Sequence, residues 1–395
     1  MNKALLHPEI QDYINTNIGQ NISTLALQKN PFPNVNWMEI LQQIEAKTKA
    51  KEKLPTWFAQ KNIIYPSKIS VEQTSSEKTA QYKASLIKGE SLIDLTGGYG
   101  VDDFYFSKSI DQIAHCEMNA DLSAIVQHNY TQLNVSNIKT YVGDSMYTLE
   151  QLNQKWDWIY IDPSRRSDVK GKVFLLKDCL PNVPENLNNY FSYSKNILIK
   201  TAPLLDLTAG LAELNFVKTI HIIAVENEVK ELLWEIEQNY IEELRIKTVN
   251  LRQNKIDTFE YDWNAEASPV SLSTPLRYLY EPNSAIMKSG GFDAVAQQYQ
   301  LQKLHKHSHL YTSNELLPFP GRVFEIQNNF EYSKPNMKKY LENQKLNITT
   351  RNFPETVADI RKKWKIKEGG SNYCFFSTDL NNRKIVLICA KIEHL

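Results

Sequence analysis

The sequence predicts an α/β protein: a mostly parallel, seven-stranded sheet with a helical N-terminal domain and a small α+β C-terminal region. Three observations lead to this fold class. Between residues 91 and 265, short apolar runs alternate with helical patterns, which is typical of a parallel sheet covered by helices. Before residue 86, apolar residues recur at spacings of three and four. After Trp263, prolines cluster and the pattern changes to short strands and helices.

The first 85 residues are predicted to form helices. Ile10 and Ile14 share one helical face, and Trp37 begins a second periodic run. Asn36 directly precedes that run, where an asparagine side chain caps a helix well.

The segment 86–265 is predicted to hold the sheet. Its strands are expected at Ser91 to Thr96, Ile113 to Met118, Ile138 to Gly143, Trp156 to Ile161, Asn196 to Thr201, Thr219 to Val225 and Ile246 to Leu251.

Two smaller parts follow. We expect a connector module over 266–320, with a helix from Phe292 to about Lys303. Residues 321–395 read as strand, helix, strand, helix and a hairpin that turns at Asn381-Asn382.

Composition limits the possible classes of protein. The 395 residues are 42% apolar, enough for two or three domains with their own cores. Lysine plus arginine balances aspartate plus glutamate at 45 each, which argues against a globally basic nucleic-acid binder. The last 65 residues, however, carry 13 cations against 7 acids, so positive charge gathers in the tail.

Four cysteines, Cys116, Cys179, Cys374 and Cys389, form no Cys-x-x-Cys pair, and we expect reduced, mostly buried thiols. No apolar stretch has the length of a membrane helix, and the N-terminus lacks a secretory core, so we expect a cytoplasmic protein.

A glycine cluster follows the first predicted strand. The chain has only 13 glycines, yet Gly97, Gly98 and Gly100 lie within four positions, directly after Asp94-Leu-Thr96. Glycine lets the main chain approach a ligand, and the carboxyl end of a parallel strand is where open α/β sheets bind nucleotides. A dinucleotide fingerprint would need glycine at Asp103, and a carboxylate there repels a pyrophosphate. The loop therefore favours a nucleoside ligand without phosphates, such as S-adenosylmethionine; the alternative is a plain turn without a ligand.

Acids end the next two strands. Glu117 lies 19 residues after Gly98, where Rossmann-type sheets place the acid that binds the ribose hydroxyls, and Met118 offers an apolar face to adenine. Asp144, followed by Ser145, ends the third strand and suits the exocyclic amine of adenine. The alternatives are a surface acid at Glu117 and a helix N-cap at Asp144.

The fourth strand delivers Asp162-Pro163-Ser164-Arg165 to the same edge of the sheet. Pro163 restricts the main chain after Asp162, so the aspartate and the following groups can hold an acceptor in line with a methyl group. Asp162 also counts among the candidate cofactor contacts. Arg165 and Arg166 suit phosphate or carboxylate, or else pair with nearby acids.

Two further patterns occur in the C-terminal third of the sequence. His305, His307 and His309 alternate, but no acid or cysteine with ligand spacing accompanies them, so we expect no metal. The basic run from Arg361 to Lys367 surrounds Trp364, which would be available for stacking on a nucleic acid; the alternative is that these cations stabilise the helix end.

Together, the stretches Val71 to Asp103, Asp162 to Arg166, Arg351 to Pro354 and Glu368 to Gly370 resemble bacterial class I S-adenosylmethionine-dependent methyltransferases with a C-terminal THUMP-like domain. The resemblance implies four parts: a helical domain (1–85), a Rossmann-like methyltransferase domain (86–265), a ferredoxin-like module (266–320) and a THUMP-like domain (321–395). THUMP domains bind RNA in modification enzymes, so the resemblance implies an RNA substrate, tRNA or rRNA.

The sequence departs from two related motifs. Methyltransferases for exocyclic base amines follow Asp-Pro with a second proline and an aromatic, where this chain has Ser164 and Arg165. Carbon-5 uridine methyltransferases use a cysteine after the fifth strand, where this chain has Lys200-Thr-Ala-Pro203. Two other functions stay open: a non-catalytic RNA-binding protein with a vestigial pocket, and a methyltransferase for a small molecule or a protein.

Overall fold

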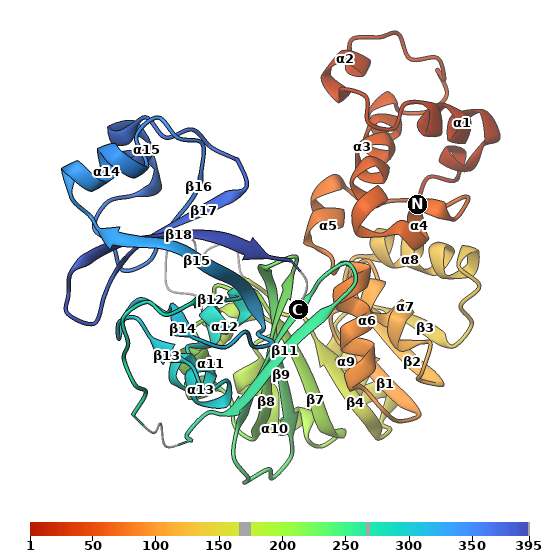
Figure 1. Cartoon of the computed structure of the whole chain (residues 1–395). Coiled ribbons are helices and arrows are strands. Elements are labelled where there is room, and N and C mark those ends of the chain that lie inside the picture. The colour runs from red at the N-terminus through yellow and green to blue at the C-terminus, as the bar shows by residue number, and fades with distance from the viewer. Residues whose placement is uncertain (166–174, 266–268, 394–395) are drawn as a thin grey trace. The chain divides into compact units, whose positions relative to one another are not determined.

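The computed structural model describes residues 1–165, 175–265 and 269–393 (Figure 1). Arg166 therefore lies outside the described residues. The chain divides into two compact units, Met1–Thr219 with Glu231–Glu242, and Ile220–Lys230 with Glu243–Leu395. Among the described residues, no helix pairs the length with the apolar character that crossing a bilayer requires.

The N-terminal part is helical, as predicted. A 3-10 turn (Lys3–Leu6) precedes α1 (Pro8–Thr16), α2 (Ile22–Ala26), α3 (Trp37–Lys53), α4 (Pro55–Ala59), α5 (Lys68–Gln73) and α6 (Glu77–Leu86). The predicted cap is confirmed, because the Asn36 side chain accepts a hydrogen bond from the Met38 N–H. The end of α3 packs through Ala46 and Ala50 with residues of α7 and α8, so these helices share a core with the sheet that follows.

All seven predicted strands form. They are β1 (Ser91–Asp94), β2 (Gln112–Glu117), β3 (Ile138–Val142), β4 (Trp156–Ile161), β7 (Ser194–Thr201), β8 (Val217–Val225) and β10 (Arg245–Leu251). In the first unit the order is β3-β2-β1-β4-β7-β9, and the first five strands run parallel. The connecting helices are α7 (Val101–Phe106), α8 (Ala120–Gln132), α9 (Ser145–Leu152), α10 (Val183–Tyr190) and α11 (Leu207–Glu213).

Two further strands of this sheet were not predicted. β9 (Glu228–Glu237) lies antiparallel to β7, and β11 (Ile256–Asp262) lies antiparallel to β10. Because β9 contains four glutamates, its apolar positions do not form a clear strand pattern in the sequence. The sequence signal for β9 is the pair Glu226-Asn227 that precedes it. In the structure both residues have positive φ (47° and 66°), the conformation of a two-residue hairpin turn.

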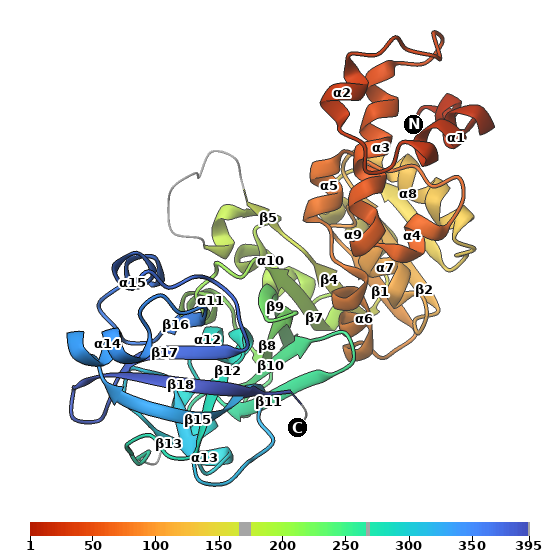
Figure 2. The same cartoon turned by 45° about the horizontal axis from the view of Figure 1, so that its top comes forward.

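The second unit contains a seven-stranded sheet in the order β13-β14-β12-β15-β18-β17-β16 (Figure 2). Its elements are β12 (Tyr278–Pro282), α12 (Ser284–Ser289), α13 (Phe292–Gln298), β13 (Gln302–Lys303), β14 (Tyr311–Ser313), β15 (Gly321–Glu331), α14 (Lys334–Tyr340), β16 (Asn347–Thr350), α15 (Val357–Trp364), β17 (Asn372–Thr378) and β18 (Lys384–Ile392). The predicted strand and helix order after residue 321 is confirmed, including the β17–β18 hairpin. Because β12 pairs with β15, the sheet runs continuously through the expected border at residue 320.

His309 makes this unit sensitive to acid. Burial, with help from Lys303, His307 and Arg351, lowers the pKa of His309 to about 4, and its ring stacks on Phe292 at 3.6 Å between centroids. Below about pH 6.5 the unfolded chain therefore takes up a proton that the folded chain refuses, and stability falls as pH decreases toward 4. Between pH 7 and 5 we expect wild type to lose about 1 kcal/mol more than His309→Asn in denaturant titrations, after allowance for the partial exposure of the ring. A His307→Asn control removes one of the smaller contributions and should keep most of the wild-type loss. Equal losses in all three proteins would contradict the assignment.

Candidate functional site

The glycine loop is held by the Asp94 side chain and by the main chain of β2. The buried Asp94 carboxylate accepts hydrogen bonds from the Thr96 N–H (2.7 Å) and hydroxyl (3.0 Å). The Gly97 N–H donates to the Cys116 carbonyl (2.8 Å), so the loop is tied to β2. The loop is therefore held in one shape between the carboxyl ends of β1 and β2.

The three glycines are needed for different reasons. A Cβ on Gly97 would lie 2.2 Å from the His115 ring, and one on Gly100 would lie 2.1 Å from the Tyr130 hydroxyl oxygen. Gly98 has a φ of +57°, and a Cβ there would meet only the Thr96 carbonyl oxygen, at 3.6 Å. Packing thus explains Gly97 and Gly100. At Gly98 the backbone angle favours glycine, and the space beside it is open.

Glu117 lies next to this open space. One carboxylate oxygen accepts the Gly98 N–H (3.0 Å) and the other accepts the Asn119 N–H (2.7 Å). Each oxygen of an ionised carboxylate has further acceptor capacity. The half-buried carboxylate is therefore fixed in place and still able to accept two hydroxyl groups, which fits the expected ribose contact.

Apolar side chains are exposed at the carboxyl ends of β2 and β3. Met118 is 76% exposed, Val142 58% and Tyr147 63%. Sequence reasoning named Met118 but missed Val142 and Tyr147. The sequence could have indicated both residues, because one apolar residue lies just before the Gly143-Asp144 turn and the other lies shortly after it. Exposed apolar side chains near the open space at Gly98 suit an adenine ring.

Asp144 caps the N-terminus of α9, which was the alternative to its predicted contact with adenine. It accepts the Tyr147 N–H (2.9 Å) as N-cap of α9, which Ser145 begins, and its side chain is exposed. Gly143 has a φ of +124°, and a Cβ there would meet nothing within 4 Å. Capping uses one carboxylate oxygen, so Asp144 can still meet a ligand at this edge.

A buried cluster supports the loop from below. Asp103 was expected to repel a pyrophosphate, but its carboxyl group does not face the loop surface: it is fully buried and lies 2.7 Å from Nδ1 of His115. Burial raises the pKa of both Asp94 and Asp103 and lowers that of His115, so the neutral forms are favoured.

Asp94, Asp103 and His115 also bring three possible metal-ligand atoms within 4.8 Å of one another. The 2.7 Å separation of Asp103 and His115 is a hydrogen-bond distance, which a bridging ion would have to break. We interpret this cluster as hydrogen-bonded support for Gly97. Of the three histidines considered for a metal, His305 hydrogen-bonds Asn352 (2.9 Å) and Asn382 (3.2 Å), and His309 stacks on Phe292.

The Asp162 loop joins the glycine loop. The Asp162 N–H donates to the Thr96 hydroxyl oxygen (2.6 Å), Pro163 is buried, and Ser164–Arg165 form the short strand β5. β5 pairs with β6 (Cys179–Leu180), which places Ser164 opposite Leu180. The structure thus brings together the predicted acceptor loop and the predicted cofactor loop.

Sequence reasoning missed the partner of Asp162. Lys200, near the end of β7, forms an ion pair with the Asp162 carboxylate. Behind it lies a second buried lysine, Lys83 of α6, which contacts Glu231 (2.8 Å) and Asp102 (3.1 Å). Two sequence features could have indicated these residues: a lysine lies within the apolar strand β7, and another lies on the packed face of α6.

The tail contradicts one prediction. Trp364 is only 6% exposed, packs in the core under α14 and α15, and donates from its indole nitrogen to the Tyr332 hydroxyl (3.1 Å). It is therefore not available for stacking on a base. Lys362, Lys365 and Lys367 are exposed, so the cationic surface remains.

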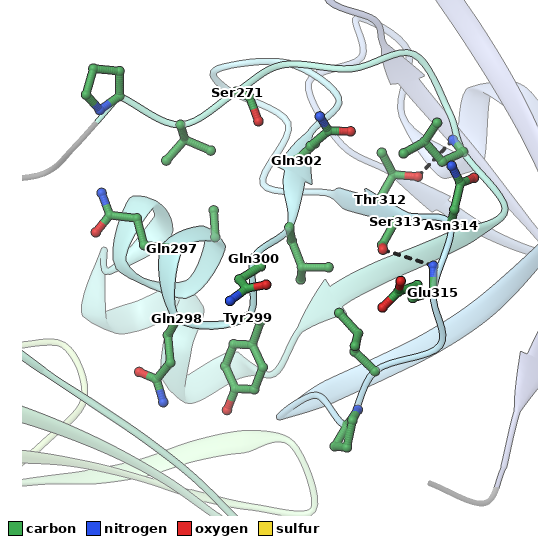
Figure 3. A pocket seen from close by; sticks show the side chains of 17 residues that line it. Ser271, Gln297, Gln298, Tyr299, Gln300, Gln302, Thr312, Ser313, Asn314 and Glu315 are labelled. Carbon is green, nitrogen blue, oxygen red and sulfur yellow. Dashed lines mark hydrogen bonds between the residues drawn. The ribbon is translucent and has the colours of Figure 1, made fainter.

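A cavity of about 810 Å³ lies in the second unit, beside α13 and β14 (Figure 3). Amide side chains gather around it, including Gln300, Gln302 and Asn314, and the ring of Tyr299 lies at its lower side (Figure 3). No predicted cofactor or acceptor residue lines this cavity, so its size alone would have misplaced the candidate site.

The parallel strand order, the glycine loop after β1 and the acid after β2 define a Rossmann-like methyltransferase fold in the first unit. Family models match the second: a ferredoxin-like domain at residues 278–320 and a THUMP domain-like family at 321–391. These matches confirm the ferredoxin-like and THUMP-like parts of the predicted fold. The exact domain borders stay a prediction.

Among solved structures, the chain is similar to one described as a "putative methyltransferase" from Porphyromonas gingivalis W83, with 29% identity, a TM-score of 0.88 and 99% of each chain covered. An rRNA methylase from Streptococcus thermophilus shares 13% identity over 40% of this chain and 93% of its own (TM-score 0.30). TrmK from M. capricolum, in complex with S-adenosyl-homocysteine, shares 15% over 45% of this chain and 70% of its own (TM-score 0.32). No curated protein matches the sequence.

Proposed function

We propose that the chain is a class I S-adenosylmethionine-dependent methyltransferase that acts on RNA in the cytoplasm. The observation that carries the proposal is the Glu117 carboxylate, which two main-chain N–H groups hold beside the open space at Gly98. The near full-length similarity to a structure described as a methyltransferase supports it. We also propose the four-domain division at 1–85, 86–265, 266–320 and 321–395.

Each proposed cofactor residue has a definite part. Glu117 accepts the ribose hydroxyls, Met118 contacts adenine and Asp144, beside Ser145, accepts from the adenine amine. Asp94 and Thr96 hold the loop made by Gly97, Gly98 and Gly100, and Thr96 links it to Asp162. Bound S-adenosylmethionine supplies an electrophilic methyl group.

The loop of Asp162, Pro163, Ser164 and Arg165 is proposed to orient the acceptor. Asp162 lies at the carboxyl end of β4, the neighbour of β1, so its carboxylate is on the same edge of the sheet as Gly98. Methyl transfer requires an acceptor in line with the methyl group, and most of the catalysis is then positioning.

An RNA acceptor is supported by the THUMP-like match and by the exposed cations Lys362, Lys365 and Lys367. Charge reversal at these three lysines should weaken RNA binding and turnover, whereas reversal at exposed Lys51 should not. If turnover is unchanged in the triple variant, a small molecule or protein acceptor is favoured.

Methyl transfer is tested with tritiated S-adenosylmethionine and RNA from a strain that lacks the gene. Wild type should label this RNA, Asp162→Ala should not, and mass spectrometry of nucleosides from the two strains should reveal the missing modification. If neither protein labels RNA while wild type still binds it, the non-catalytic RNA-binding function is correct.

Cofactor binding gives a separate prediction. Glu117→Ala removes both ribose contacts and the acceptor of the Gly98 N–H, so we expect S-adenosylmethionine affinity to fall at least about 100-fold, or about 3 kcal/mol, by calorimetry. Asp111→Ala, an exposed acid just before the same strand, is the matched control and should bind like wild type. Equal affinities for the two variants would refute the ribose assignment.

A further inference from the structure

Asp162 is held from two sides. Its N–H is bound by Thr96 of the glycine loop, and its carboxylate pairs with Lys200, which is near the end of the neighbouring parallel strand β7. The Lys200 side chain is 12% exposed and that of Asp162 is 37% exposed. The lysine therefore lies behind the carboxylate, and the carboxylate is the group that faces solvent.

Lys200 is charged despite its burial. Burial alone lowers the pKa of a lysine, but the carboxylates of Asp162, Asp102 and Glu231 outweigh this effect and raise the pKa of Lys200. A lysine that keeps its proton is a hydrogen-bond donor and cannot act as a general base.

The carboxylates behind Lys200 are themselves fixed. Asp102 accepts hydrogen bonds from the Ser75 hydroxyl (2.8 Å) and the Tyr160 hydroxyl (2.8 Å), and both Asp102 and Glu231 contact Lys83. Lys83 thus contacts two of the acids, and Lys200 forms its ion pair with the third, Asp162.

We propose that Lys200 is a positioning residue that holds the Asp162 carboxylate toward the acceptor. This inference rests on the proposed function and deepens it, because it names the side chain that fixes the acceptor loop. Lys200 acts on the acceptor through Asp162, since it lies behind the carboxylate.

Three variants test the role of Lys200. Lys200→Met should lower turnover at least 100-fold while S-adenosylmethionine affinity, measured by calorimetry, stays within threefold of wild type. Lys200→Arg, which keeps the donor, should recover turnover to within tenfold. Lys200→Met combined with Asp162→Asn should be no slower than Asp162→Asn alone, because one residue acts through the other. Full turnover in Lys200→Met would overturn the positioning role.

A structural readout keeps this test independent of activity. A crystal structure of Lys200→Met should show the Asp162 carboxylate displaced, and an unmoved carboxylate overturns the inference even if the enzyme is inactive. If wild type neither binds S-adenosylmethionine nor labels RNA, the proposed function fails while this crystallographic result still decides the role of Lys200.

Discussion

Gly97→Ala is expected to abolish measurable S-adenosylmethionine binding and to lower the free energy of unfolding by about 2–3 kcal/mol. The added Cβ would lie 2.2 Å from the His115 ring, which is fully buried and hydrogen-bonded to Asp103. Because the buried His115 ring cannot move freely, the glycine loop must shift instead. That shift carries Gly98 away from Glu117 and opens the proposed ribose site. Calorimetry measures the affinity and denaturant titration the stability.

Gly210→Ala is the matched control. A Cβ at Gly210 would lie 2.3 Å from the Trp234 ring, a similar collision in the same unit but on α11. It should cost similar stability and leave cofactor affinity within threefold of wild type. Equal loss of affinity in both variants would show that the first effect is general destabilisation, and normal binding by Gly97→Ala would refute the loop assignment.

The sequence was informative wherever the signal was local. The glycine cluster, the Asn36 cap and the apolar core of β4 each follow from a few neighbouring residues, and the structure agrees on their form. The spacing from Gly98 to Glu117 was enough to predict that they meet, because consecutive parallel strands end at one edge.

Local patterns could not provide the long-range partners. Lys83 and Glu231 are 148 residues apart, and a pattern search shows each only as a charged residue in a mixed segment. Trp364 was misjudged for the same reason: the surrounding lysines suggested a surface, whereas its ring packs with side chains of β17 and β18. Which face of a short helix is buried depends on the sheet beneath it.

These long-range contacts explain how Asp162, a half-exposed acid at the carboxyl end of β4, can be held in one position. Burial raises the pKa of Asp102, but Lys83 and Lys200 outweigh burial and hold that pKa below its ordinary value. An ionised Asp102 in turn keeps Lys200 charged. The stability of the first unit and the geometry of the proposed acceptor site therefore depend on the same buried charges.

Lys83→Met should accordingly be among the most destabilising single changes in the chain, lowering the free energy of unfolding by about 3–5 kcal/mol. Lys83 is fully buried, and its ammonium group contacts Glu231 (2.8 Å), Asp102 (3.1 Å) and the Ser75 hydroxyl (2.9 Å). Methionine fills most of the volume but leaves two buried carboxylates short of a counter-charge. Urea titration of wild type and variant measures the difference.

Lys78→Met is the control for charge and helix propensity, since Lys78 is exposed on the same helix, and it should change stability by less than about 0.5 kcal/mol. Adding Glu231→Gln to Lys83→Met removes one uncompensated charge, so the double variant should be more stable than Lys83→Met alone although it carries one substitution more. This reversal separates an electrostatic cost from a packing cost. If Glu231→Gln instead lowers stability further, the loss in Lys83→Met comes from packing, and the buried charges do not support the acceptor site as argued.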